Sequence, residues 1–234
     1  MSTHNISKSD KTVYLKEQND INKIFLSFIK DSKNSIDLIN GIKAFISTYL
    51  SSLVTGKLIN QYKDTKDKII SNDTLDSYDW NVINYNLNNP YLWKAYRDLD
   101  IELSNRVNYI ITEGISKSIN PRLIRDTIMR EMTDLTKNRV QTIIRTELHN
   151  IANISKEAQY RRIDANNEAK YKWLSVPDHR RTTYCTRISD RTRNGVSLDE
   201  LKKIIREESD LKVYSPARPY QPHINCRSTF IRIY

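Results

Sequence analysis

Two cysteines and a histidine are the residues of this 234-residue chain whose types and spacing best suit chemistry. His223 and Cys226 are separated by two residues, which lets both side chains reach one metal ion from a tight loop. Cys185 lies on an earlier loop, so a metal held by all three would join two loops. A closed zinc site needs a fourth ligand, for which Asp178 and His179 are the nearest candidates. Alternatively, the cysteines are small buried residues without a metal, and His223 bonds a backbone group.

A group of arginines around Cys185 predicts an anionic partner. The net charge is +1 over residues 1–120 and +9 over residues 121–234, where 16 of the 23 basic residues are arginines. The planar guanidinium matches phosphate oxygens well, and nucleic acid is the commonest anionic partner of such a surface. We therefore interpret five loop arginines as candidate DNA contacts, with a solvated basic surface as the alternative. The five are Arg180, Arg181, Arg187, Arg191 and Arg193.

Two carboxylates near these loops could either do acid–base chemistry or fix the fold. Glu147 follows Arg145 on an expected helix with apolar neighbours, and Asp178 opens a polar turn. Because no second carboxylate or activated nucleophile accompanies them, we favour a structural role. In that interpretation the helix carboxylate pairs with a loop arginine, such as Arg180 or Arg227, and ties the loops to the helix.

Helices must supply the frame for these loops. The chain has only 4 glycines and 6 prolines, and apolar residues recur at helical spacing through residues 20–136. Residues 1–19 are polar and predict a flexible arm. Asn120-Pro121 suits a helix start, and a second helical segment is expected over about residues 137–164. Aromatic residues between positions 78 and 96 are interpreted as packing residues, with a base-stacking platform as the alternative.

The character of the sequence changes after Asp164. Residues 171–176 predict a strand, Ser197 caps an expected short helix, and residues 228–234 alternate as a terminal strand would. Helices followed by short strands predict an α+β fold, with a mainly helical N-terminal region and a small α+β C-terminal domain over residues 137–234.

Several short motifs in residues 138–230 resemble, as an ordered set, the C-terminal domain of the phage Mu F-like head morphogenesis proteins, which are minor capsid proteins. That family runs as Arg-Thr-Glu, an Asn, a Trp, an Asp-x-Arg-Thr-Cys-x-x-Cys loop, a Gly and a terminal His-Pro-Asn-Cys-Arg-Cys. The matching residues here are Arg145-Thr146-Glu147, Asn153, Trp173, Asp178 to Cys185, and Pro222 to Ser228. The family pattern implies a four-ligand zinc site, but Thr182 and Ser228 stand here where it has cysteines.

The resemblance implies a function and a place for the protein. It implies a minor capsid protein of a tailed phage, present in a few copies inside the head near the portal or inner shell. Portal or inner-shell proteins and packaged double-stranded DNA would be its partners, and it would assist assembly and accompany the DNA. It would be made in the host cytoplasm, where two cysteines remain thiols. A structural zinc is the one cofactor considered, and no membrane segment is expected because no run approaches ~18 apolar residues.

A phage-encoded effector enzyme delivered with the DNA is the alternative. A His-Asn-His nuclease would need a histidine after His223 and Asn225, and none follows. An ADP-ribosyltransferase, an activity sometimes fused to this family's domain, would need a Glu-x-Glu pair, which the sequence lacks. We therefore expect a protein that is not an enzyme.

Overall fold

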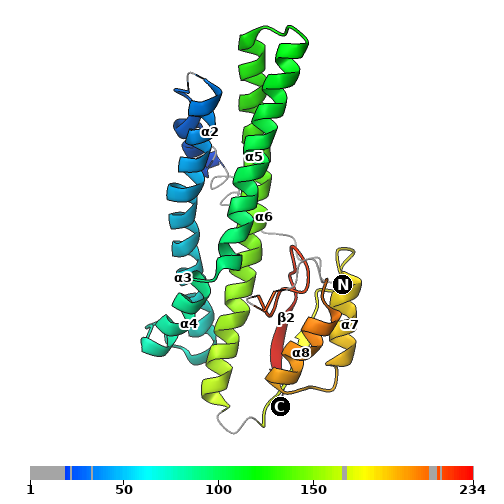
Figure 1. Ribbon diagram of the computed structural model, residues 1–234. Coiled ribbons are helices and arrows are strands. Elements are labelled where there is room, and N and C mark those ends of the chain that lie inside the picture. Colours follow the sequence, from blue (N-terminus) through cyan, green and yellow to red (C-terminus); the bar gives the residue numbers. More distant parts are fainter. Residues whose placement is uncertain are drawn as a thin grey trace. The chain divides into compact units, whose positions relative to one another are not determined.

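The computed structural model describes residues 19–21, 23–32, 34–164, 168–210, 215–216 and 218–233. The arm predicted for residues 1–19 lies outside these residues except for its last position. The described chain is mainly helical with one small sheet, which confirms the expected α+β class (Figure 1). In chain order the elements are α2 (Ser35–Ala44), the π-helix η1 (Phe45–Leu50), α3 (Ser51–Ile70), α4 (Ser77–Leu87), α5 (Pro90–Ser116), α6 (Pro121–Ile163), β1 (Lys170–Leu174), α7 (Thr183–Arg191), α8 (Leu198–Glu208) and β2 (Thr229–Ile233).

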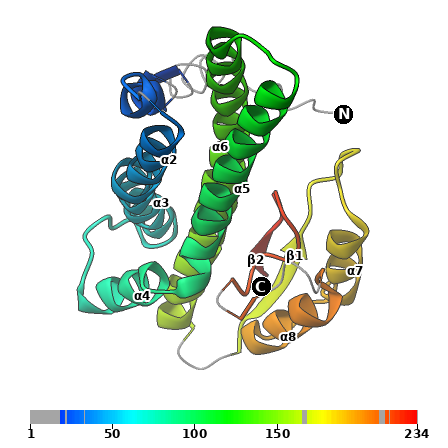
Figure 2. The same cartoon turned by 45° about the horizontal axis from the view of Figure 1, so that its top comes forward.

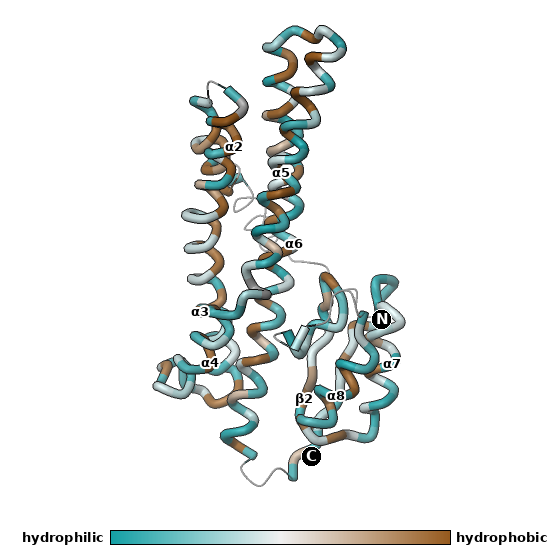
Figure 3. Tube along the Cα trace, viewed as in Figure 1, coloured by the Kyte–Doolittle hydropathy of each residue, from teal (hydrophilic) through white to brown (hydrophobic). Residues whose placement is uncertain are grey.

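The chain forms two compact units, and each unit combines two stretches of sequence. Unit 1 contains Met1–Leu53 and Ala95–Gln141, and unit 2 contains Val54–Lys94 and Thr142–Tyr234. Helix α6 is continuous from Pro121 to Ile163, so the expectation of two successive helical segments here was wrong. Hydrophobic and hydrophilic residues are interspersed along the helices, as Figure 3 shows for α5.

Unit 1 is held together by apolar packing between helices. Residues 23–29 are helical, and the ring of Phe25 packs edge to face on Phe45 with centroids 5.2 Å apart. Leu103 of α5 and Met132 of α6 are fully buried. Burial of such side chains is the main source of stability for helices of this length.

Unit 2 contains the sheet, in which β1 and β2 run antiparallel. Trp173 lies opposite Phe230 in the register, and both rings are buried. Helices α7 and α8 lie beside this sheet (Figure 2). Helix α8 begins after Ser197, whose hydroxyl accepts a hydrogen bond from the Glu200 amide as the sequence predicted for a capped helix. Helix α7 carries Cys185, Arg187 and Arg191, and Cys226 lies in the segment that precedes β2.

A buried polar network in unit 2 fixes α6 to α3 and α4. Lys66 is 1% exposed, and its Nζ lies 2.5 Å from Oδ2 of Asp79, which is fully buried. The Tyr62 hydroxyl and the Gln159 amide of α6 donate hydrogen bonds to Oδ1 of the same carboxylate, at 2.9 and 3.1 Å. A buried ion pair is tolerated only when its remaining hydrogen-bonding positions are satisfied in this way. The network therefore sets the position of α6, which supports the candidate site.

The aromatic residues of α4 and of the start of α5 do not all pack in the interior. Tyr96 is buried, but Tyr78, Trp80 and Tyr85 of α4 are 43, 41 and 73% exposed. The interpretation of these three as packing residues was therefore wrong. The guanidinium of Arg162 instead lies over the face of the Tyr78 ring, 4.4 Å from the ring centroid, in a cation–π contact.

Candidate metal and thiol centre

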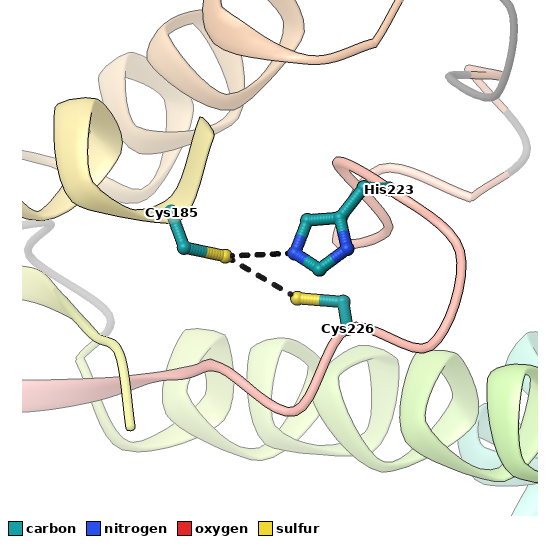
Figure 4. Close-up of side chains that lie close together, drawn as sticks. All are labelled: Cys185, His223 and Cys226. Carbon is teal, nitrogen blue, oxygen red and sulfur yellow. Dashed lines mark hydrogen bonds between the residues drawn. The ribbon is translucent and has the colours of Figure 1, made fainter. Parts of the chain in front are cut away.

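Cys185, His223 and Cys226 lie side by side in unit 2, with their side chains turned toward one another (Figure 4). The Cys185 sulfur is 3.1 Å from Nε2 of His223 and 3.6 Å from the Cys226 sulfur. The three donor atoms all lie within 4.8 Å of one another. Both cysteines are buried free thiols, and His223 is half-buried. The structure thus brings together the three residues that the sequence singled out as candidate ligands.

Two local structures hold this cluster. Cys185 lies in the first turn of α7, and its amide donates to the capping hydroxyl of Thr182 at 3.4 Å. The other two residues come from the turn that precedes β2, where Asn225 adopts a left-handed backbone conformation with φ of 56°. The His223 ring stacks on Tyr184, with centroids 6.2 Å apart. Since β2 pairs with β1, the sheet fixes where this turn meets the start of α7.

The Cys185 sulfur lies at the middle of the cluster. Its hydrogen bonds with Cys226 and with His223, and the bond that it accepts from the Ser228 hydroxyl at 3.1 Å, lower the pKa of Cys185 well below its ordinary value, against the effect of burial. The same bond to Cys185, together with burial, raises the pKa of Cys226. Burial alone would lower the pKa of His223, but its bond with Cys185 outweighs burial and raises it. These opposite shifts make Cys185 the more acidic of the two thiols.

Helix α6 anchors the segment that follows Cys226. Nε2 of His149 donates to the Ser228 carbonyl at 2.6 Å, because a carbonyl can only accept. Asn153 is 1% exposed, and its Oδ1 accepts from the Thr229 hydroxyl at 2.6 Å. Burial lowers the pKa of His149, so its ring is held neutral. Asn153 belongs to the motif found in the sequence, whereas the parts played by His149 and Ser228 were missed.

The donor set fits three of the four positions of a tetrahedral zinc site. Two sulfurs bound to one zinc lie about 3.8 Å apart, because each Zn–S bond is about 2.3 Å long, and the observed separation is 3.6 Å. Neither candidate for the fourth ligand belongs to the cluster. Asp178 uses both oxygens to accept from Arg227, at 2.7 and 2.8 Å, and His179 is exposed. The residues therefore suit an open three-ligand site, in which a water would complete the coordination.

Glu147 and Asp178 both form ion pairs, but the partner expected for Glu147 was wrong. Glu147 is 3% exposed and lies 2.5 Å from Nη2 of Arg218, a loop residue that the sequence interpretation had not considered. Burial raises the pKa of Glu147 to about 7, although the charge of Arg218 opposes the rise. Arg227, the expected partner, instead binds Asp178 and lowers the pKa of that carboxyl. Arg145 of the same motif is exposed.

The candidate DNA-binding arginines do not lie on one loop. Arg187 and Arg191 are on α7, so the expectation that the whole stretch is a loop was wrong. Arg187 pairs with Glu208 at 2.5 Å, and Arg191 pairs with Glu207 and Glu208 of α8 at 2.7 and 2.9 Å. These glutamates supply the neutralising charge that was missing from the local sequence. The other three candidates are Arg180 and Arg193, both exposed, and Arg181, which is half-buried.

Comparisons of this chain with protein-family models, with curated proteins and with solved structures found no match. In the described part of the chain, no helix combines the length and apolar character needed to span a bilayer. The case for a function therefore depends on the residues of the chain and on their arrangement.

Proposed function

We propose that this protein is a minor capsid protein of a tailed phage that acts in head morphogenesis. The observation that carries the proposal is that motif residues from distant parts of the sequence meet at one centre. Asn153 of α6 binds Thr229, the neighbouring Ser228 binds Cys185 of α7, and Cys185 binds His223 and Cys226. This shared cluster supports the interpretation of the motifs as one ordered set.

The cluster has a structural role in this proposal and no catalytic one. It fastens the start of α7 to the segment before β2, while Asn153 fastens that segment to α6. Cys185, His223 and Cys226 would hold a zinc ion, and the ion would supply a further link between the same two segments. The portal or the inner shell is the proposed partner, and the inside of the head is the proposed location.

Contact with packaged DNA belongs to the same proposal. Residues 121–234 carry a net charge of +9, which attracts a polyanion without reading its sequence. Among the candidate contacts, Arg187 and Arg191 already share carboxylates with α8. Arg180 lies farther from its carboxylate partner, 3.9 Å from Asp178, so Arg180, Arg181 and Arg193 are the arginines that we expect to contribute most.

Affinity purification from infected cells tests the assembly role. A tagged copy of the full chain should co-purify portal or inner-shell proteins of the phage that encodes it. The matched control is the same tagged chain with Cys185→Ser and Cys226→Ser, which removes the centre and should reduce recovery of those proteins. Recovery of neither portal nor shell protein with the unmodified chain would contradict the proposal.

A further inference from the structure

The two sulfurs at the candidate centre are placed for a reaction with each other as well as for metal binding. The Cys185 and Cys226 sulfurs are 3.6 Å apart, with the Cys226 thiol hydrogen-bonded to Cys185. A disulfide bond is about 2.05 Å long, so the sulfurs need to approach by roughly 1.5 Å. Cys226 lies just after a turn, next to the exposed residues Ile224 and Asn225. A shift of the turn by about that distance would close the gap.

The missing fourth ligand leaves this dithiol open to oxidation. Ser228 and Thr182 supply hydroxyls where the family pattern supplies sulfur, and Asp178 is bound to Arg227. Three ligands hold zinc less firmly than four, so the thiols are less protected than in a closed site. Both cysteines are at most 3% exposed, which hinders a bulky oxidant and favours one of about the size of water.

We propose that Cys185 and Cys226 form a site of reversible oxidation, at which a hydroperoxide converts the two thiols into a disulfide. The Cys185 sulfur lies at the middle of the cluster, within hydrogen-bond distance of His223 and Cys226, and it accepts from the Ser228 hydroxyl, so we assign Cys185 as the attacking sulfur. Cys226, whose sulfur lies 3.6 Å from that of Cys185, is the resolving residue.

The reaction balances with the hydroperoxide as the only oxidant. The Cys185 sulfur attacks one peroxide oxygen, the O–O bond breaks, and a sulfenic acid forms while the departing hydroxide takes the Cys185 proton to become water. The Cys226 sulfur then attacks the Cys185 sulfur, the S–O bond breaks, and the second hydroxide takes the Cys226 proton. Two thiols and one hydrogen peroxide yield one disulfide and two waters. The two thiols lose two electrons, and the peroxide gains them.

The bond would join two segments that are 41 residues apart. It would fix the start of α7 to the turn before β2, where metal binding would otherwise do so. The use of this bond in the particle rests on the proposed function. There the two thiols would be reduced during assembly in the cytoplasm. They would become oxidised after release, because disulfides persist outside reducing compartments.

Mass spectrometry of the purified full chain tests the chemistry. Metal is first removed with a chelator, and one equivalent of hydrogen peroxide is added. The number of free thiols should fall from two to zero, and the mass of the monomer should fall by two hydrogens. Dithiothreitol should restore both thiols. Cys226→Ser should instead yield a sulfenic acid at Cys185 that reacts with dimedone, and prior loading with zinc should slow the reaction. Two unchanged thiols, a covalent dimer, or direct over-oxidation of the unmodified chain would overturn the proposal.

A second experiment distinguishes failure of this proposal from failure of the proposed function. Procapsids and released particles are denatured in an alkylating reagent, and the thiols of this chain are counted. Reduced protein in procapsids and oxidised protein in released particles is the expected result. Protein that is present but reduced in released particles overturns the use of the bond in the particle. Protein that is absent from both overturns the proposed function and leaves the solution chemistry standing.

Discussion

Replacing Ser228 with cysteine should convert the open centre into a closed four-ligand zinc site. The Ser228 hydroxyl already lies 3.1 Å from the Cys185 sulfur, and the residue is 4% exposed. A sulfur at this position therefore replaces an oxygen next to the existing donors, without a new contact to solvent. The backbone need not move, because its carbonyl is held by His149.

The size of the effect follows from the energy of a complete site. Four-ligand structural zinc sites in small peptides bind with about 10–16 kcal/mol, or roughly 2.5–4 kcal/mol for each ligand. The fourth ligand should thus increase zinc affinity by about two to three orders of magnitude, since 1.4 kcal/mol corresponds to about tenfold. Ser228→Ala is the matched control, because it removes the hydroxyl and adds no ligand.

Competition with a chromophoric chelator measures the zinc affinity of the three proteins, and cobalt(II) spectra report the coordination. Ser228→Cys should bind zinc most tightly and give the intense visible bands of a tetrahedral cobalt site with three thiolates. The unmodified chain and Ser228→Ala should bind similarly to each other. If Ser228→Cys binds zinc no more tightly than Ser228→Ala, the assignment of Cys185, His223 and Cys226 as metal ligands is wrong.

Three further predictions concern the ion pairs and the charged surface. Because the pKa of Glu147 is raised to about 7 in the fold, its contribution to stability is complete below about pH 4.3, the usual pKa of an unfolded glutamate. That contribution is lost as pH rises toward 7, so Glu147→Gln should flatten the pH dependence of urea unfolding in this range, and an unchanged slope would refute the shift. Lys66→Met should cost about 3–5 kcal/mol in the free energy of unfolding because it leaves the Asp79 charge buried, and the double variant Lys66→Met/Asp79→Leu should recover part of that loss; equal or greater loss in the double variant would show that the pair does not act as a unit. Serine replacement of three candidate arginines should flatten the salt dependence of duplex binding by a slope of about 3, since each phosphate contact contributes about 0.9. The three are Arg180, Arg181 and Arg193. The matched control, Arg187→Ser with Arg191→Ser, should leave the slope nearly unchanged, and the reverse result would place the contacts on α7.

The sequence predicted the two strands and the start of α8 well because the signals there are local. Alternating residues near positions 171 and 229 marked the two strands, and Ser197 marked the start of α8. Helix α7 was missed although signals for it exist. Thr182 is a capping residue, and the buried Cys185 and Ile188 are three positions apart, but the many arginines obscured this pattern.

Long-range pairings could not be predicted in the same way. Nothing local distinguishes Arg218 from other loop arginines as the partner of Glu147, because the pair joins residues far apart in the sequence. Lys66 and Asp79 likewise resemble ordinary surface charges in the sequence, yet both are buried. The motif residues around Cys185 were found because their order along the chain could be compared with a family pattern, whereas His149 carries no such signal.

Quantitative mass spectrometry of protease-treated, DNA-filled particles tests the central claim most directly. The particles come from the phage that encodes this chain, and its peptides are counted against those of the major shell protein. A minor capsid protein inside the head should be detected at a small fraction of the shell protein, and protease added from outside should not remove it. Absence of the chain from intact particles, or its complete removal by external protease, would contradict the account.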